Sequence, residues 1–164
     1  MPHAVKPIPD GYHSLTPALI VKDADAAIGW YQKALGAKLE NRMTGPDGKS
    51  VSHAELRIGD SLLFLGDEQS SMGAKSPTSL GGTHGSLHLY TLDADAAYQR
   101  AVDAGAKPIL PPSDMPWGDR YGRFRDPFGH EWGVATRKEE LTAAEMERRT
   151  REWSIRLSQE ARPS

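Results

Sequence analysis

The sequence predicts an α+β fold made of two tandem βαβββ modules followed by a C-terminal helix. The main observation is an internal repeat, because the pentapeptide Asp-Ala-Asp-Ala-Ala occurs at residues 23–27 and again at residues 93–97. Each copy follows a short apolar run and precedes a helical pattern with nearly the same ending, Leu-Gly-Ala-Lys at 35–38 and Ala-Gly-Ala-Lys at 104–107. Two copies are too few for a solenoid, so we expect a duplicated module that closes on its twin.

The composition is that of an ordinary globular chain. Of the 164 residues, 38% are hydrophobic and 26% are charged, which suits one compact domain or two half-domains that share a core. The net charge of −2 gives no electrostatic basis for binding nucleic acid or an anionic membrane. The absence of cysteine excludes disulfides, thiolate metal sites and a cysteine nucleophile. The sequence shows neither a signal-peptide pattern nor an apolar run of membrane-spanning length, so we expect a cytoplasmic protein.

The repeat and the distribution of proline and glycine divide the chain into five expected segments: an N-terminal arm at 1–13, the first module at 14–66, a linker at 67–85, the second module at 86–136 and an amphipathic helix at 137–164. The arm contains three prolines and is expected to be irregular. The linker is rich in glycine and serine. A glycine-rich run that cradles phosphate needs a helix directly after it, whereas a strand is expected here, so we interpret the linker as a flexible connection.

The first module is expected to begin with a strand and an N-capped helix. Residues 15–21 form a short apolar run, which favours a buried strand over a helix. Asp23 stands at the expected N-cap, where its carboxylate can accept hydrogen bonds from the first turn, and Asp93 has the same place in the second copy. Apolar residues at three- and four-residue spacing predict a helix over 24–35, with Gly36 as its C-terminal stop.

Three further strands complete the predicted first module. Residues 38–43 form the first of them, and the Thr-Gly-Pro-Asp-Gly sequence at 44–48 is a strong turn signal. Residues 51–58 alternate between the two sides of a strand. Gly-Asp at 59–60 indicates a two-residue hairpin turn, after which 61–65 form the last strand.

The second module is expected to repeat this order. A strand at 86–91 is followed by a helix over 94–104. Residues 108–117 contain four prolines and therefore cannot be a central strand throughout. Residues 118–125 and 130–136 are expected to form a hairpin around the turn sequence Asp-Pro-Phe-Gly.

The C-terminal segment is predicted to be an amphipathic helix. Thr142 and Glu145 have the spacing of a capping box. The helix carries a narrow apolar stripe made of Met146, Thr150, Trp153 and Leu157. Such a stripe must be buried, either against the chain's own sheet or against a partner subunit. Together with the need to cover sheet edges, this favours a homodimer.

The predicted modules resemble the vicinal-oxygen-chelate superfamily, which includes glyoxalase I, bleomycin-resistance proteins and extradiol dioxygenases. The resemblance covers residues 14–136 and is most similar to the PhnB-like branch. It is carried by four stretches: Thr-Pro-Ala-Leu-Ile-Val-Lys-Asp at 16–23, His-Ala-Glu-Leu-Arg-Ile-Gly-Asp at 53–60, Trp-Gly-Asp-Arg-Tyr-Gly at 117–122 and Arg-Asp-Pro-Phe-Gly-His at 125–130.

The resemblance implies that each module curls into a half-barrel cup and that paired cups enclose a cavity. In metal-binding members, the ligands lie on the first and last strands of each module. Carried over position by position, these sites fall on Thr16, about Phe64, Ser86 and about Gly133. None of the four is a histidine or a carboxylate, so the standard metal ligands are missing and no cofactor is expected.

A shifted metal site is an alternative. Side chains alternate along a strand, so His88 shares a face with Ser86, and Glu131 shares a face with Gly133. If His53 projects into the same cavity, two histidines and one carboxylate form a suitable set for zinc or iron(II). The competing interpretation is that His53 and His88 are hydrogen-bonded residues of a polar pocket wall, with Glu131 as a pocket or surface carboxylate.

Aromatic residues gather in the last third of the sequence. Trp117 and Tyr121 are predicted to line the pocket, where they could stack on a planar ligand or a cation. If Glu131 faces the cavity, alternation places its neighbour Trp132 in the core against the helix. The neighbouring Asp119 and Arg120 could orient a polar ligand, although a salt bridge is favoured for them.

Three hypotheses of function remain after these observations. The first is a protein that binds a small molecule in an aromatic-lined cavity through His53, His88, Trp117, Tyr121 and Glu131. The second is a metal-dependent lyase, isomerase or dioxygenase that uses the shifted His53, His88 and Glu131 set. The third is an interaction module whose terminal helix docks on a partner. The expected partners are therefore a small-molecule ligand and a second copy of the chain, with no nucleic acid and no membrane.

Overall fold

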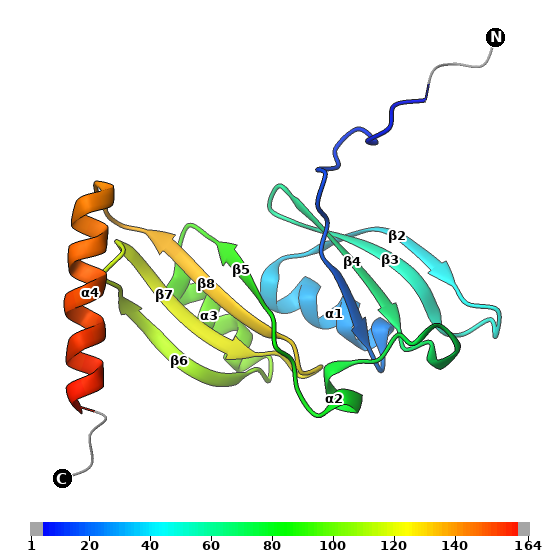
Figure 1. The fold of residues 1–164 in the computed structure, drawn as a ribbon. Helices are drawn as coiled ribbons and strands as arrows, with labels where there is room; N and C mark the ends of the chain where they lie inside the picture. Colours follow the sequence, from blue (N-terminus) through cyan, green and yellow to red (C-terminus); the bar gives the residue numbers. More distant parts are fainter. Residues whose placement is uncertain (1–4, 161–164) are drawn as a thin grey trace. The chain divides into compact units, whose positions relative to one another are not determined.

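A computed structural model describes residues 5–160 of the chain, which divide into two compact units. The first unit extends to His84 and also includes Phe128–His130, and the second comprises Gly85–Pro127 and the chain from Glu131 onward. Each unit contains one four-stranded sheet and a helix between its first and second strands (Figure 1). The predicted α+β fold with two βαβββ modules and a C-terminal helix is confirmed.

The first unit contains β1 (Ala18–Val21), α1 (Ala24–Leu35), β2 (Lys38–Thr44), β3 (Val51–Ile58) and β4 (Ser61–Asp67). Its sheet has the strand order β1-β4-β3-β2. The first strand pairs with the last in parallel, and the other pairs are antiparallel. Strand β1 begins at Ala18 rather than at residue 15, because Leu15 is 85% exposed and lies outside the sheet.

The second unit repeats this topology with β5 (Ser86–Tyr90), α3 (Ala94–Asp103), β6 (Lys107–Asp114), β7 (Asp119–Arg125) and β8 (Glu131–Arg137), followed by α4 (Ala143–Glu160). The strand order is β5-β8-β7-β6, again with the first and last strands parallel. The proline-rich strand β6 lies at the sheet edge and has two register shifts against β7. An edge position suits it because proline has no N–H to donate to a neighbouring strand.

The repeated aspartates cap the helices as predicted. Asp23 Oδ1 accepts a hydrogen bond from the amide of Ala26 at 2.9 Å, and Asp93 Oδ1 accepts one from Ala96 at 3.0 Å. At the other end of α1, Gly36 adopts the left-handed conformation with φ of 67° and closes the helix.

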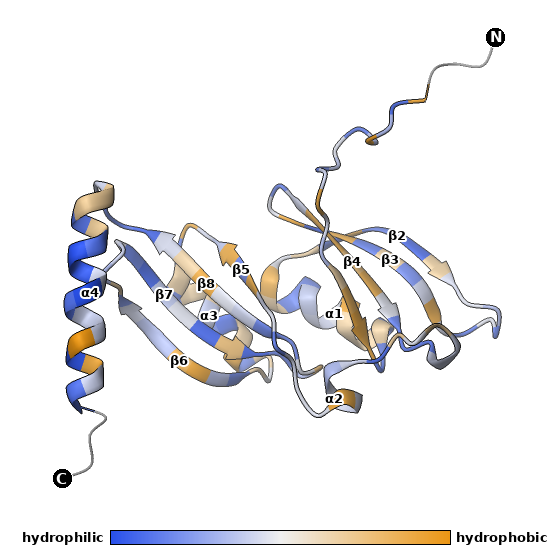
Figure 2. Cartoon of the chain, in the orientation of Figure 1, coloured by the Kyte–Doolittle hydropathy of each residue, from blue (hydrophilic) through white to orange (hydrophobic). Residues whose placement is uncertain are grey.

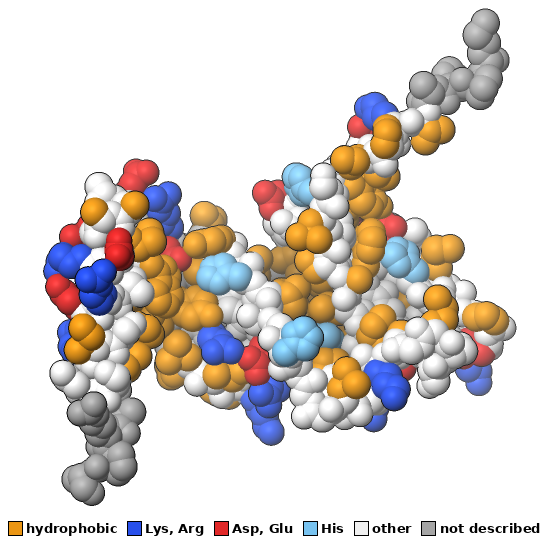
Figure 3. All heavy atoms as spheres, in the orientation of Figure 1, with side chains coloured by type: hydrophobic (Ala, Val, Ile, Leu, Met, Phe, Trp, Pro, Cys, Tyr) orange, Lys and Arg blue, Asp and Glu red, His pale blue; other side chains and the backbone are white. Residues whose placement is uncertain are grey.

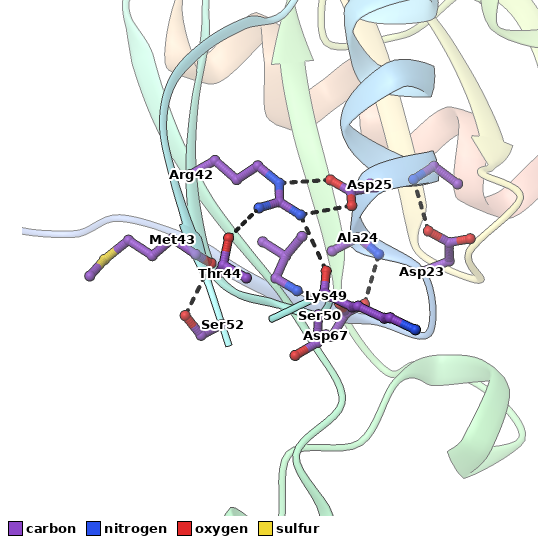
Figure 4. A network of polar contacts seen from close by, with 12 residues as sticks. Asp23, Ala24, Asp25, Arg42, Met43, Thr44, Lys49, Ser50, Ser52 and Asp67 are labelled. Atoms are coloured by element: carbon purple, nitrogen blue, oxygen red, sulfur yellow. Dashed lines mark hydrogen bonds and ion pairs between the residues drawn. The ribbon is translucent and has the colours of Figure 1, made fainter. Parts of the chain in front are cut away.

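The last strand of each module also holds the first amide of its helix. Asp67 at the end of β4 accepts from the amides of Ala24 and Val51, both at 2.7 Å, and so joins the start of α1 to the start of β3 (Figure 4). In the second unit, Thr136 Oγ1 accepts from the amide of Ala94 at 2.8 Å. The helix of each module is thereby fixed in register with its sheet.

The second aspartate of each repeat forms a paired salt bridge with an arginine of the sheet. Arg42 on β2 donates to both carboxylate oxygens of Asp25 at 2.8 Å (Figure 4). Arg120 on β7 donates to both oxygens of Asp95 at 2.8 Å. Arg120 is therefore a salt-bridge residue on the helix side of the sheet, and the hydrogen bond that it donates lowers the pKa of Asp95.

The segment 67–85, which we expected to be a flexible connection, contains local structure. A 3-10 helix, η1, covers Ser70–Met72, and a short helix, α2, covers Pro77–Leu80. Glu68 accepts hydrogen bonds from both the amide and the hydroxyl of Ser76, at 2.7 and 2.6 Å. The Ser76 hydroxyl is the main reason that the pKa of Glu68 falls to about 2.

The core of each unit lies between its sheet and the helix that follows the first strand. In the second unit, Tyr98 and Ala101 of α3 are buried together with Phe124, Trp132 and Val134 of the sheet. Figure 2 shows apolar residues interspersed with polar ones along the strands of both sheets. The core residues alternate with side chains on the opposite face of each sheet, which we call the open face.

Helix α4 is attached to the second unit through aromatic and ionic contacts. Trp153 packs edge-on against Trp117 with ring centroids 6.1 Å apart. Arg149 forms an ion pair with Glu139 at 2.9 Å. Leu157 of the predicted stripe remains exposed. Over residues 5–160, none of the helices combines the length and the apolar character needed to cross a bilayer.

Asp67→Asn should reduce the free energy of unfolding by about 1–3 kcal/mol, because an amide cannot accept from both backbone N–H groups and one buried donor loses its partner. Urea unfolding followed by circular dichroism measures this effect. Asp60→Asn, at an exposed turn position, is the control and should change stability by less than about 0.5 kcal/mol. Equal effects of the two substitutions would contradict the role given to Asp67.

Candidate ligand site on the second unit

The open face of the second sheet carries polar and aromatic side chains. Cross-strand pairing determines which residues lie on this face, because residues directly opposite each other point to the same side of a sheet. The pairs that lie on this face are Ser86 with Glu131, His88 with Gly133, Tyr90 with Ala135, Tyr121 with Ala135, Arg123 with Gly133 and Asp119 with Arg137. These side chains are free of the helix core and can form a site.

A cavity of about 740 Å³ lies over this face; its lining consists of His88, Tyr90, Trp117, Asp119, Tyr121, Arg137 and Met146. Strands β5, β7 and β8, the β6–β7 loop and helix α4 all contribute to it. Figure 3 shows hydrophobic side chains gathered where α4 meets the strands of this unit. The volume is within the range of about 300–1,000 Å³ that is typical of small-molecule sites.

Aromatic rings form one continuous wall of the cavity. The His88 and Tyr121 rings are nearly parallel, with an interplanar angle of 11° and centroids 5.5 Å apart. Trp117 meets Tyr121 at 5.8 Å and 66°, and Tyr90 lies 4.8 Å from His88. The wall continues to Trp153 of α4 through its edge-on contact with Trp117.

Gly133 makes the position of Tyr121 possible. A Cβ atom at Gly133 would lie 2.7 Å from Tyr121 Cε2 and 2.9 Å from its hydroxyl oxygen. No side chain other than hydrogen fits at this position while the ring lies over the strand. Burial of the Tyr121 ring also raises the pKa of its hydroxyl above the ordinary value.

The polar groups of the cavity are a buried carboxylate and an exposed guanidinium. Asp119 is only 5% exposed, and its Oδ2 accepts a hydrogen bond from the Tyr90 hydroxyl at 2.9 Å. This hydrogen bond is the main reason that the pKa of Tyr90 is raised. The Arg137 side chain is 62% exposed and donates toward the carbonyl oxygen of Glu139 at 3.4 Å.

The structure brings together three of the five predicted ligand-binding residues, namely His88, Trp117 and Tyr121. Glu131 lies on the same face but pairs with Arg123 at 2.6 Å and Arg125 at 2.7 Å. The hydrogen bond from Arg125 is the largest of the effects that lower its pKa. Glu131 therefore acts in this structure as the centre of an ion-pair cluster.

His53, the remaining predicted residue, belongs to the open face of the first unit. Its Nε2 lies 3.2 Å from Glu55 Oε1, and its ring contacts Phe64 at 4.8 Å. Tyr12 donates a hydrogen bond to the other oxygen of Glu55 at 2.5 Å, and this hydrogen bond lowers the pKa of Glu55. His53 is therefore hydrogen-bonded to Glu55 and is not among the residues that line the cavity of the second unit.

Trp132 lies in the core, where alternation predicted it. It is buried against the α3 side of the sheet, and its Nε1 donates to Asp126 Oδ2 at 3.0 Å. Three cavity residues, Tyr90, Arg137 and Met146, were missed as site residues in the sequence. Tyr90 follows His88 by two positions and could have been found from alternation, whereas Arg137 requires the β7–β8 register.

A comparison with known families agrees with the observed fold. The sequence model of the Glyoxalase/Bleomycin resistance protein/Dioxygenase superfamily matches residues 12–134, which contain the first sheet and extend into β8, the last strand of the second. The chain belongs to this superfamily. An uncharacterised protein of Mycobacterium bovis is 45% identical over 137 residues, covering 82% of this chain and 90% of the relative.

Solved structures show the same fold. The crystal structure of TioX from Micromonospora sp. ML1 has a TM-score of 0.59 and 26% identity, covering 76% of this chain and 98% of TioX. An Arabidopsis thaliana gene product has a TM-score of 0.61 and 28% identity over the same shares of the two chains. A PhnB protein from Bacillus cereus, at 14% identity and a TM-score of 0.59, covers 76% of this chain and 99% of its own, and it shares the fold.

The superfamily's metal-ligand positions do not fit a metal in this chain. Phe64 and Gly133 carry no donor side chain, and the Tyr121 ring fills the space beside Gly133. Thr16 and Ser86 provide only hydroxyl groups. Within residues 5–160, no group of three or more histidine, aspartate or glutamate side chains is arranged to hold a metal ion.

Gly133→Ala should displace the Tyr121 ring from its place beside His88, because the new methyl group would lie within 3 Å of the ring. Loss of the parallel ring should shift the His88 ring-proton NMR signals in the same direction as Tyr121→Leu does. Gly29→Ala is the control, since its Cβ would meet no atom within 4 Å. Unchanged His88 signals in Gly133→Ala would contradict the packing described.

Proposed function

We propose that the protein binds a small organic molecule with a planar ring in the cavity of the second unit. The observation that carries this proposal is the continuous aromatic wall, in which the His88 and Tyr121 rings are nearly parallel and Trp117 stands at their edge. A planar ligand can stack on such a surface or meet it edge-on. Aromatic pairs of this kind contribute about 0.5–1.5 kcal/mol beyond the burial of their area.

The chemical balance of the cavity supports a binding role. Its walls are mostly apolar, through the aromatic rings and Met146, and its polar groups are few and separate, as is typical of sites that orient a ligand. The aromatic side chains come from β5, β7, the β6–β7 loop and α4. Two of these elements, β5 and β7, are strands of the sheet that packs against the helix core.

Helix α4 is part of this proposal. Met146 lines the cavity, and Trp153 supports Trp117 from the side. The stripe predicted on this helix thus provides one boundary of the site. We infer that α4 contributes to ligand affinity through these two residues, in addition to any contact of the exposed Leu157 with another chain.

The proposal is tested by titrating the full chain with neutral, water-soluble bicyclic aromatics such as 1-naphthalenemethanol, using isothermal titration calorimetry. We expect saturable binding of one molecule per chain. Tyr121→Leu and Trp117→Leu should each weaken binding by about tenfold or more, equivalent to about 1.4 kcal/mol, because a central aromatic contact is lost.

The matched control is Leu92→Ala in the same unit, because Leu92 is 98% exposed and does not line the cavity. It should bind the probes as the unchanged chain does. Circular dichroism verifies that each variant is folded. The proposal would be overturned if none of the bicyclic aromatics bound saturably. It would also be overturned if Tyr121→Leu, Trp117→Leu and the Leu92→Ala control all bound with equal affinity.

A further inference from the structure

The Asp119 carboxylate has no charged partner within the part of the chain that the structure describes. It is almost completely buried, yet the salt bridges of residues 5–160 do not include it. Burial of an ionised carboxylate is costly unless hydrogen bonds or an opposite charge compensate it. The single hydrogen bond from Tyr90 to Oδ2 is a partial compensation.

The second oxygen of Asp119 accepts no side-chain hydrogen bond from the described residues. No side-chain hydrogen bond reaches Oδ1, and among the described residues no fully buried side-chain oxygen is left without a partner. Oδ1 therefore has access to solvent, and the residue lines the cavity. Its free lone pairs are available to a donor on a ligand.

Arg137 is the opposite charge that could compete for this carboxylate, but it is engaged elsewhere. The two residues are cross-strand partners, and their charged atoms are not in ion-pair contact. The Arg137 guanidinium lies 3.6 Å from Glu140 and donates toward the carbonyl of Glu139. The buried charged group of the cavity is therefore the Asp119 carboxylate, whereas the Arg137 guanidinium lies at the exposed margin.

We propose that the ligand of this cavity carries an ammonium or other organic cation, which Asp119 binds while the aromatic wall contacts its cationic face. This inference rests on the proposed function, because it names the class of ligand for the same cavity. Electron-rich faces of tryptophan and tyrosine attract cations, and the attraction increases when water is excluded. A carboxylate beside such rings adds a charge-assisted hydrogen bond from the ammonium.

The test is a charge series built on one ring: 1-naphthylmethylammonium, 1-naphthalenemethanol and 1-naphthoate. Each compound is titrated into the full chain at about pH 8. We expect the ammonium compound to bind at least about tenfold more tightly than the alcohol, and the carboxylate compound to bind most weakly.

Asp119→Asn should remove the preference for the cation, because the side chain keeps its shape and loses its charge. The ratio of the affinities for the ammonium compound and the alcohol should fall from at least about tenfold to within about twofold in this variant. Asp114→Asn is the matched control; it removes the same charge from a side chain that is 81% exposed and lies outside the cavity. It should keep the full preference for the ammonium compound.

The outcomes separate this inference from the proposed function. Equal binding of the alcohol and the ammonium compound would overturn the cationic ligand, and a preference that persists in Asp119→Asn would overturn the role of Asp119. Either result leaves the binding function standing. Failure of all three compounds to bind would overturn both. If Asp119→Asn does not fold, the charge series on the unchanged chain decides the matter by itself.

Discussion

The site depends on one constraint, the alternation of side chains along β7 and β8 when a helix covers only one face of the sheet. Phe124, Trp132 and Val134 must point toward α3 to form the core, so their neighbours must point away from it. The fixed attachment of α3, through Thr136 and the Asp93 cap, keeps this assignment in register. A slip of one residue would exchange the core with the open face.

The glycine at position 133 allows an aromatic surface to form on the open face of the second sheet. At Gly133 the strand surface is bare, and the Tyr121 ring from the neighbouring strand lies over it beside His88. The aromatic surface extends from Tyr121 to Trp117 and from there to Trp153 of the terminal helix. One small residue on β8 thus allows this aromatic surface to form.

The sequence predicted the fold well, because the information that specifies it is local. The repeated caps at Asp23 and Asp93 and the turn signals mark where elements begin and end. Alternation also placed Trp132 in the core and His88 on the open face. The partners of Glu131 were less accessible, since two arginines of β7 reach it only through the register of that hairpin. Likewise, the role proposed for Asp119 depends on the side-chain conformations in the cavity, and these cannot be predicted from the spacing of residues in the sequence.

The most direct measurement is a map of backbone amide chemical shifts of the full chain as a ring-bearing cation is added. We expect the large changes to lie in β5, β7 and β8 and around Met146 of α4, with Tyr121 and Asp119 among the most affected. The amides of the first unit should change little. Changes concentrated on α3 or on the first unit, with the open face of the second sheet unaffected, would contradict the site described.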